Sequence, residues 1–202
     1  MLDSGMIYQM MSLSVLLLLC VANVSAKEWH VYERCELAED ENADGDSFSV
    51  KAGTGYTYVF RLYGVDCAET NSQSASRLKE QLKEFDLEQE AVFSWGEKAA
   101  AFTRQFLQKP FIVFTQKIKV GSSGGQSRYY AMIVNAEGKR LDEALIEAGL
   151  ARSYGEGAEW DEPFWGKNQV DLPKRITSKR FIRKLHALES KAKRGRIGVW
   201  ER

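Results

Sequence analysis

Three separated segments of the chain carry the residues whose types and spacing could do chemistry. They combine carboxylates with arginines: Asp44 and Asp46, then Arg61, Asp66 and Glu69, then Arg128. Two or more carboxylates, with carbonyl oxygens and water, form the kind of site that a hard divalent cation such as Ca²⁺ prefers. Arginines suit a phosphate, because each guanidinium donates two hydrogen bonds and stabilises charge in a pentacoordinate transition state. The set predicts metal-assisted hydrolysis of a phosphodiester.

Glu69 is placed to be the base that this reaction needs. Ca²⁺ acidifies its bound water only weakly, so a carboxylate has to accept the proton. The two histidines, His30 and His186, lie at opposite ends of the chain, which argues against a zinc site or a histidine-based triad. A structural interpretation stays open, in which the acids cap turns and the arginines are ion-pair partners on a barrel rim. We take Asp44 for a turn former rather than a ligand.

The elements that must position these residues follow from hydrophobic spacing and turn signals. A hairpin turn is expected at residues 44–47 and a buried strand at 61–65. Further strands are predicted at residues 31–37, 56–62, 111–115 and 128–134, and helices at 76–85, at 94–109 behind a capping box, at 141–148 and at 178–193. This order, without a β-α-β rhythm, predicts an α+β fold with a small antiparallel barrel packed against helices.

The first 26 residues predict a secretory signal peptide. Residues 12–22 are apolar but too short to span a bilayer comfortably, and small residues follow them. Because Asp3 precedes this run and no Lys or Arg does, a start at Met10 or Met11 and an uncleaved anchor both stay open. We expect residues 27–202 to form a single domain of a secreted or periplasmic protein.

Charge and cysteines leave two further alternatives. The chain has 28 basic and 28 acidic residues, so its net charge predicts no partner. Residues 164–202 are strongly basic, which fits either contact with a polyanion or a solvated amphipathic helix. Cys35 and Cys67 either form a disulfide, worth about 3 to 4 kcal/mol on the chain-entropy model, or are two buried thiols.

Six pieces of the chain, in the same order, resemble the staphylococcal-nuclease-like (thermonuclease) family. One of them is Arg-Leu-Tyr-Gly-Val-Asp-Cys-Ala-Glu-Thr at residues 61–70. The others lie at residues 44–47, 96–103, 128–134 and 141–151, and at 189–193 together with 198–200. The resemblance covers roughly residues 30 to 201.

The resemblance implies an OB-fold, a five-stranded antiparallel β-barrel packed against three to four helices. It also implies a Ca²⁺-dependent endonuclease that cleaves DNA and RNA on the 5′ side of the phosphodiester and leaves 3′-phosphates. The implied roles are calcium binding by the carboxylates of Asp46 and Asp66 and the backbone carbonyl of Cys67, phosphate binding by Arg61 and Arg128, general base catalysis by Glu69, and base stacking by Tyr154. No stable protein partner and no membrane contact after signal removal are implied, and we expect a monomer.

The chain departs from the family pattern in three places. Cys67-Ala68 stands where the family usually has Thr-Pro, and a disulfide at Cys67 would shift the metal loop. Gln126-Ser127 replaces a Lys-Tyr pair, which removes a phosphate and base contact. Residues 71–93 are more numerous than in the smallest members, and they predict an added helix beside the site.

Two other functions stay open. One is a non-catalytic module of the same fold that binds nucleic acid or a protein through the barrel face. Such modules commonly lose an arginine or the glutamate, whereas Arg61, Arg128 and Glu69 are all present here. The other is a secreted structural domain that binds Ca²⁺ for stability, which would not need the two arginines.

Overall fold

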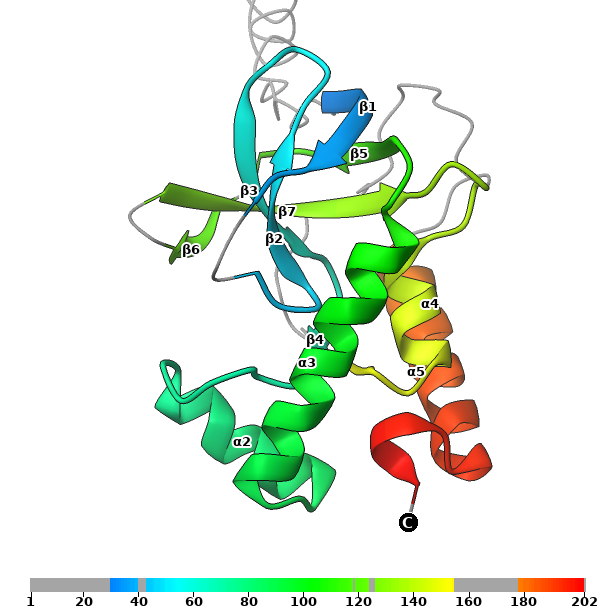
Figure 1. Cartoon of the computed structure of the whole chain (residues 1–202). Coiled ribbons are helices and arrows are strands. Elements are labelled where there is room, and N and C mark those ends of the chain that lie inside the picture. Colours follow the sequence, from blue (N-terminus) through cyan, green and yellow to red (C-terminus); the bar gives the residue numbers. More distant parts are fainter. Residues whose placement is uncertain (1–29, 40–42, 118, 124–125, 155–177, 202) are drawn as a thin grey trace, which may run out of the picture.

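The computed structural model describes residues 30–39, 43–117, 119–123, 126–154 and 178–201. Five strands close into a barrel (Figure 1). They are β1 (His30–Leu37), β2 (Ser47–Lys51), β3 (Thr57–Leu62), β5 (Phe111–Thr115) and β7 (Gln126–Val134). A further strand, β6 (Lys119–Ser123), pairs with β7 outside the ring. The barrel and the helices packed on it confirm the predicted α+β fold of the OB type.

One pairing differs from the antiparallel barrel that we expected. β3 and β7 run parallel, with Val59 opposite Arg128 and Arg61 opposite Tyr130. The other neighbours around the ring are antiparallel. Two helices and the strands β4, β5 and β6 separate β3 from β7 along the chain, and this long connection lets β7 enter the sheet in the same direction as β3. The barrel is therefore mixed.

The predicted strand at residues 61–65 is wrong as a continuous element. β3 ends at Leu62, a turn follows at Tyr63 and Gly64, and a separate strand β4 (Val65–Cys67) pairs with β8 (Ala151–Ser153). Gly64 has φ of +78°, and a Cβ there would lie 2.8 Å from the Phe181 ring. The break places Asp66 on β4, where its side chain contacts Arg61 of β3 as well as Arg77 and Gln81 of the helix at residues 75–85.

Four α-helices lie in the described part of the chain: α2 (Ala75–Phe85), α3 (Gln89–Phe106), α4 (Leu141–Glu147) and α5 (Ser178–Gly195), with a 3₁₀ turn η1 (Gly198–Trp200) after them. In Figure 1, α3 descends from the barrel to α2, while α4 and α5 pack together on its other side. The predicted start of α3 at Ser94 is wrong. The helix begins at Gln89, because Val92 is fully buried against α2 and stabilises the extra turn.

Two hydrophobic clusters hold these elements. The larger fills the barrel and continues under α4 and α5 with Phe60, Phe111, Ile133, Leu145 and Phe181. The smaller lies under α2, where Leu78, Phe85 and Val92 pack with Ala68 and Val199. Burying a side chain of this size contributes about 1.5–3 kcal/mol. Helix α2 is thus anchored by a core of its own beside the loop that carries Glu69.

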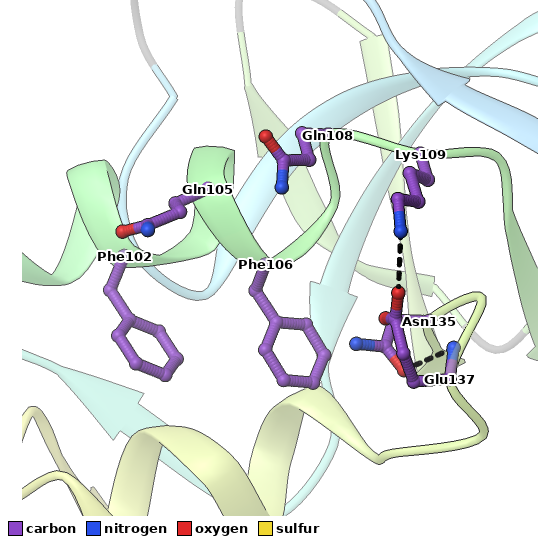
Figure 2. A pocket seen from close by; sticks show the side chains of 7 residues that line it. All are labelled: Phe102, Gln105, Phe106, Gln108, Lys109, Asn135 and Glu137. Carbon is purple, nitrogen blue, oxygen red and sulfur yellow. Dashed lines mark hydrogen bonds and ion pairs between the residues drawn. The ribbon is translucent and has the colours of Figure 1, made fainter.

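The N-terminal signal prediction concerns residues outside the described part of the chain. Among the described helices, none combines the length and apolar character needed to cross a bilayer. A surface hollow of about 360 Å³ lies between the end of α3 and the turn after β7. Figure 2 shows the side chains that line it. None of the predicted catalytic or metal-binding residues lines it, so we assign it no chemistry.

Cys35 and Cys67 are free, buried thiols in this structure. Burial raises the pKa of Cys35 to about 11 and that of Cys67 well above its usual value. Since only the thiolate reacts, we expect iodoacetamide near pH 8 to leave both residues unmodified in the native protein and to label both in guanidinium chloride. Peptide mass spectrometry checks this. Recovery of a peptide that links Cys35 to Cys67 without reduction would contradict it.

Candidate active site

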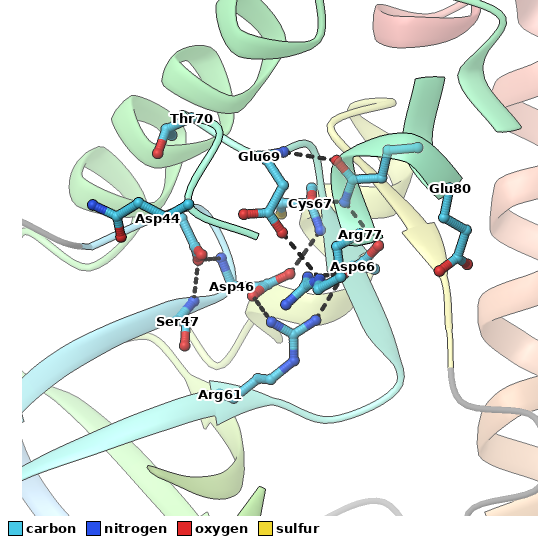
Figure 3. A network of polar contacts seen from close by, with 12 residues as sticks. Asp44, Asp46, Ser47, Arg61, Asp66, Cys67, Glu69, Thr70, Arg77 and Glu80 are labelled. Carbon is cyan, nitrogen blue, oxygen red and sulfur yellow. Dashed lines mark hydrogen bonds and ion pairs between the residues drawn. The ribbon is translucent and has the colours of Figure 1, made fainter. Parts of the chain in front are cut away.

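Arg61 lies at the centre of the site and joins two of the predicted calcium ligands. Its Nη1 donates to Asp46 Oδ1 at 2.7 Å and its Nη2 donates to Asp66 Oδ1 at 2.8 Å (Figure 3). The β2–β3 register places Ser47 opposite Arg61, so Asp46 comes next to the guanidinium. The carboxylates raise the pKa of Arg61 further, although burial opposes this, and only 4% of the side chain is exposed. The turn before β2 and the end of β3 therefore meet at this guanidinium.

Asp44 shapes the turn that presents Asp46. Its Oδ1 accepts hydrogen bonds from the backbone N–H groups of Asp46 (2.9 Å) and Ser47 (2.6 Å). The Thr103 hydroxyl on α3 donates to the Gly45 carbonyl at 2.7 Å, which holds the turn against the helix. Burial, reinforced by the neighbouring Asp46, raises the pKa of Asp44 well above its usual value. These contacts fit the role of a turn former.

Asp66 is fully buried and is surrounded by donors. Three guanidinium groups, those of Arg61, Arg77 and Arg152, and the Gln81 amide donate to its two oxygens. Burial alone raises the pKa of a carboxyl, but here the arginines, led by Arg77, lower the pKa of Asp66 below its usual value. Asp66 is thus held as a carboxylate that has no unpaired oxygen.

Glu69 lies at the edge of this network. Its Oε1 is 3.0 Å from Arg77 Nε, yet the two atoms lack hydrogen-bond geometry and neither has another partner within the described residues. The Glu69 backbone N–H donates to Gln81 Oε1 at 2.8 Å. Burial raises the pKa of Glu69, and Arg77 opposes the shift. A raised pKa and an unsatisfied oxygen are properties of a general base.

Arg128 reaches the site from β7, the parallel neighbour of β3. Its Nη1 donates to the Ser47 hydroxyl at 3.1 Å, and its Nε and Nη2 lie 3.3 Å from the Val120 carbonyl. In the part of the chain that the structure describes, it forms no ion pair with a carboxylate. Burial and the nearby Arg61 lower its pKa, so its positive charge is poorly compensated.

Tyr154 lies at the rim, with 40% of its surface exposed. Its backbone N–H donates to the Gly64 carbonyl at 3.0 Å, and its ring centre is 5.1 Å from the Arg152 guanidinium carbon. Arg152 in turn contacts Asp66 and donates to Glu80 Oε1 at 2.7 Å. Tyr154 is therefore connected to the buried network through a single arginine.

A sequence model of the staphylococcal nuclease homologue family matches residues 59–163, just over half of the chain. This chain belongs to the staphylococcal nuclease homologue family. The matched region carries Arg61, Asp66, Glu69 and Arg128, and it begins after Asp46. Among curated proteins, no match to the chain was found. The closed barrel agrees with the family, whose members typically depend on calcium and act on nucleic acids.

The described conformation of this staphylococcal nuclease homologue does not fit a calcium ion at the predicted ligands. Asp46 accepts from Arg61 and from the Cys67 N–H (2.7 Å), and both oxygens of Asp66 are paired. The Cys67 carbonyl, the third expected ligand, accepts from the Gln81 amide at 2.8 Å. Within the described residues, no group of three or more His, Cys, Asp or Glu side chains is arranged to hold a metal.

Sequence reasoning missed three members of the network, Arg77, Gln81 and Arg152. The first two lie on α2, the helix that the longer segment 71–93 predicted beside the site. Their spacing of four residues places them on one face of that helix, which was a usable signal once the helix was assigned. Arg152 follows a short helix on a strand of three residues, where no pattern marks it.

Proposed function

We propose that this staphylococcal nuclease homologue is a secreted nuclease that hydrolyses phosphodiester bonds of DNA and RNA. The observation that carries the proposal is Arg128, a half-buried guanidinium without a carboxylate partner among the described residues, beside a cluster of acids and arginines. A poorly compensated cation in this position favours an anionic substrate. Membership of a nuclease-like family supports the same reaction.

The proposed reaction uses the three residues that sequence and fold bring to this end of the barrel. Arg128 and Arg61 bind phosphoryl oxygens and stabilise the charge that develops on them. Glu69 orients a water molecule and accepts its proton as the oxygen attacks phosphorus. The bond to the 5′ oxygen breaks, so the products are a 3′-phosphate and a 5′-hydroxyl. Calcium remains the proposed cation, because members of the family typically depend on it.

A cleavage assay with one substituted carboxylate tests this function. Purified protein is incubated with single-stranded DNA or RNA, with CaCl₂ or with excess chelator, beside Glu69→Gln. We expect Ca²⁺-dependent cleavage that is reduced at least about 100-fold in Glu69→Gln, the scale of general-base catalysis. Glu97→Gln is the matched control, since Glu97 is exposed on α3. Folded wild-type protein that leaves both substrates intact would refute the proposal.

The alternative of a non-catalytic module is favoured by a different observation. Arg61 and Asp66 are almost completely buried and are paired with each other. A nucleic acid can therefore reach them only if the network opens, whereas a binding module needs no such access. Fluorescence anisotropy with labelled DNA separates the two, because binding without cleavage is the result that the module predicts.

A further inference from the structure

The side chain that bridges the acids of this site is an arginine. Arg77 extends from α2, contacts Asp66 Oδ1 through Nη2 and lies 3.0 Å from Glu69 Oε1 through Nε. One turn further along α2, Gln81 donates to Asp66 Oδ2 at 2.9 Å and to the Cys67 carbonyl at 2.8 Å. Arg77 and Gln81 thus engage the oxygens of Asp66 and the Cys67 carbonyl, two of the three ligands that a divalent cation would need.

The balance of charge at the site also favours Arg77 in the place of a divalent cation. Asp46, Asp66 and Glu69 supply three carboxylates, and Arg61, Arg77 and Arg152 supply three guanidinium groups, each at hydrogen-bond or ion-pair distance from at least one of them. Adding a divalent cation to this set would place two more positive charges against arginines that already compensate Asp66. Removing Arg77 would instead leave Asp66 and Glu69 with one fewer cation between them.

The position of Arg77 is built into the fold. Leu78 and Phe85 anchor α2 in the smaller hydrophobic cluster, together with Val92 of α3. Gln81 is fully buried, and its Oε1 accepts the backbone N–H of Glu69, which ties the helix to the loop of the site. Only about a quarter of the Arg77 side chain is exposed. An arginine that reached the site only through a chance side-chain conformation would lack these packing and hydrogen-bond contacts.

We propose that Arg77 is the built-in cation of this site, and that a divalent cation binds there only in competition with it. In the wild-type protein Arg77 of α2 pairs with Asp66 and Glu69, so calcium affinity is low. Arg77 contacts both Asp66 and Glu69. Its ion pair with Glu69 lacks hydrogen-bond geometry, so this is the weaker of the two interactions. The proposal concerns the site to which we assign hydrolysis, but its test needs no cleavage.

Calorimetric titration with CaCl₂ tests the competition directly. Arg77→Met keeps most of the apolar stem and removes the charge, and we expect it to bind Ca²⁺ at least tenfold more tightly than the wild type. Arg77→Lys keeps a cation and is expected to stay a weak binder. Lys79→Met is the matched control: it removes one positive charge from an exposed position of α2 and should bind as the wild type does.

Thermal unfolding gives a second readout, because a ligand that binds only the folded state raises Tm. Millimolar CaCl₂ should raise the Tm of Arg77→Met by clearly more than that of the wild type. If Arg77→Met does not fold at any calcium concentration, Arg77→Gln replaces it in the same comparison, because it also removes the cation but keeps a polar side chain at this position. Equal affinity of variant and wild type, or no binding by either, overturns the proposal. Gained calcium binding with no cleavage would retain it and refute only the proposed nuclease.

Discussion

Replacing Asp66 with asparagine is expected to lower the free energy of unfolding by about 3–5 kcal/mol, the cost of removing one partner from a buried ion pair. Asparagine keeps the shape of the side chain, so the loss reports the charge. Arg61, Arg77 and Arg152 all donate to this one carboxylate, which is fully buried. Each arginine would keep an ion pair with only one other acid. Three positive charges removed from water would therefore be neutralised less completely.

Urea unfolding, followed by circular dichroism, measures this loss. Glu137→Gln is the matched control, because it also removes one carboxylate from an ion pair, but the pair with Lys109 is exposed at 3.0 Å. Screened surface pairs contribute little, so the control should unfold with the wild type. If Asp66→Asn also unfolds with the wild type, the buried network does not stabilise the fold.

The sequence predicted which residues lie near one another at the site better than it predicted the contacts between their side chains. Arg61, Asp66 and Glu69 lie close together along the chain, and strand ends hold such neighbours near one another whatever the rest of the fold does. The apolar spacing of α2, with Leu78 and Phe85 on one side, also showed that a helix forms there. Periodicity does not show where that helix docks. The contact of Arg77 with Asp66 therefore became visible only in three dimensions.

The errors in the predicted elements have physical causes of the same kind. The capping-box pattern at Ser94 is a valid local signal for a helix start. Burial of Val92, however, extends α3 by more than a turn toward the N-terminus of that position. The strand assigned to residues 61–65 had the right composition, yet Gly64 allowed a turn with positive φ that tertiary packing against α5 uses. In both cases tertiary contacts outweighed a local preference.

Gly96 in α3 is a position where a single methyl group should displace the loop that carries Glu69. A Cβ at residue 96 would lie 2.4 Å from the Glu69 carbonyl oxygen and 2.7 Å from that of Ala68. Both atoms are backbone, so neither can rotate away, and α3 or the loop has to move. Although alanine favours a helix, we expect Gly96→Ala to cost roughly 2–3 kcal/mol of unfolding free energy, as overpacked interiors do.

The same displacement should disturb Glu69, because the loop and α3 touch at this point. The Glu69 N–H, which donates to Gln81 at 2.8 Å, should exchange with solvent faster in Gly96→Ala, and NMR hydrogen exchange detects this. Gly195→Ala is the control, since its new methyl meets only the side chain of the partly exposed Ile197, at 3.1 Å. Its effect on stability should stay within about 1 kcal/mol. Equal stability of both variants, with unchanged exchange at Glu69, would show that the close approach of α3 does not position the loop of the site.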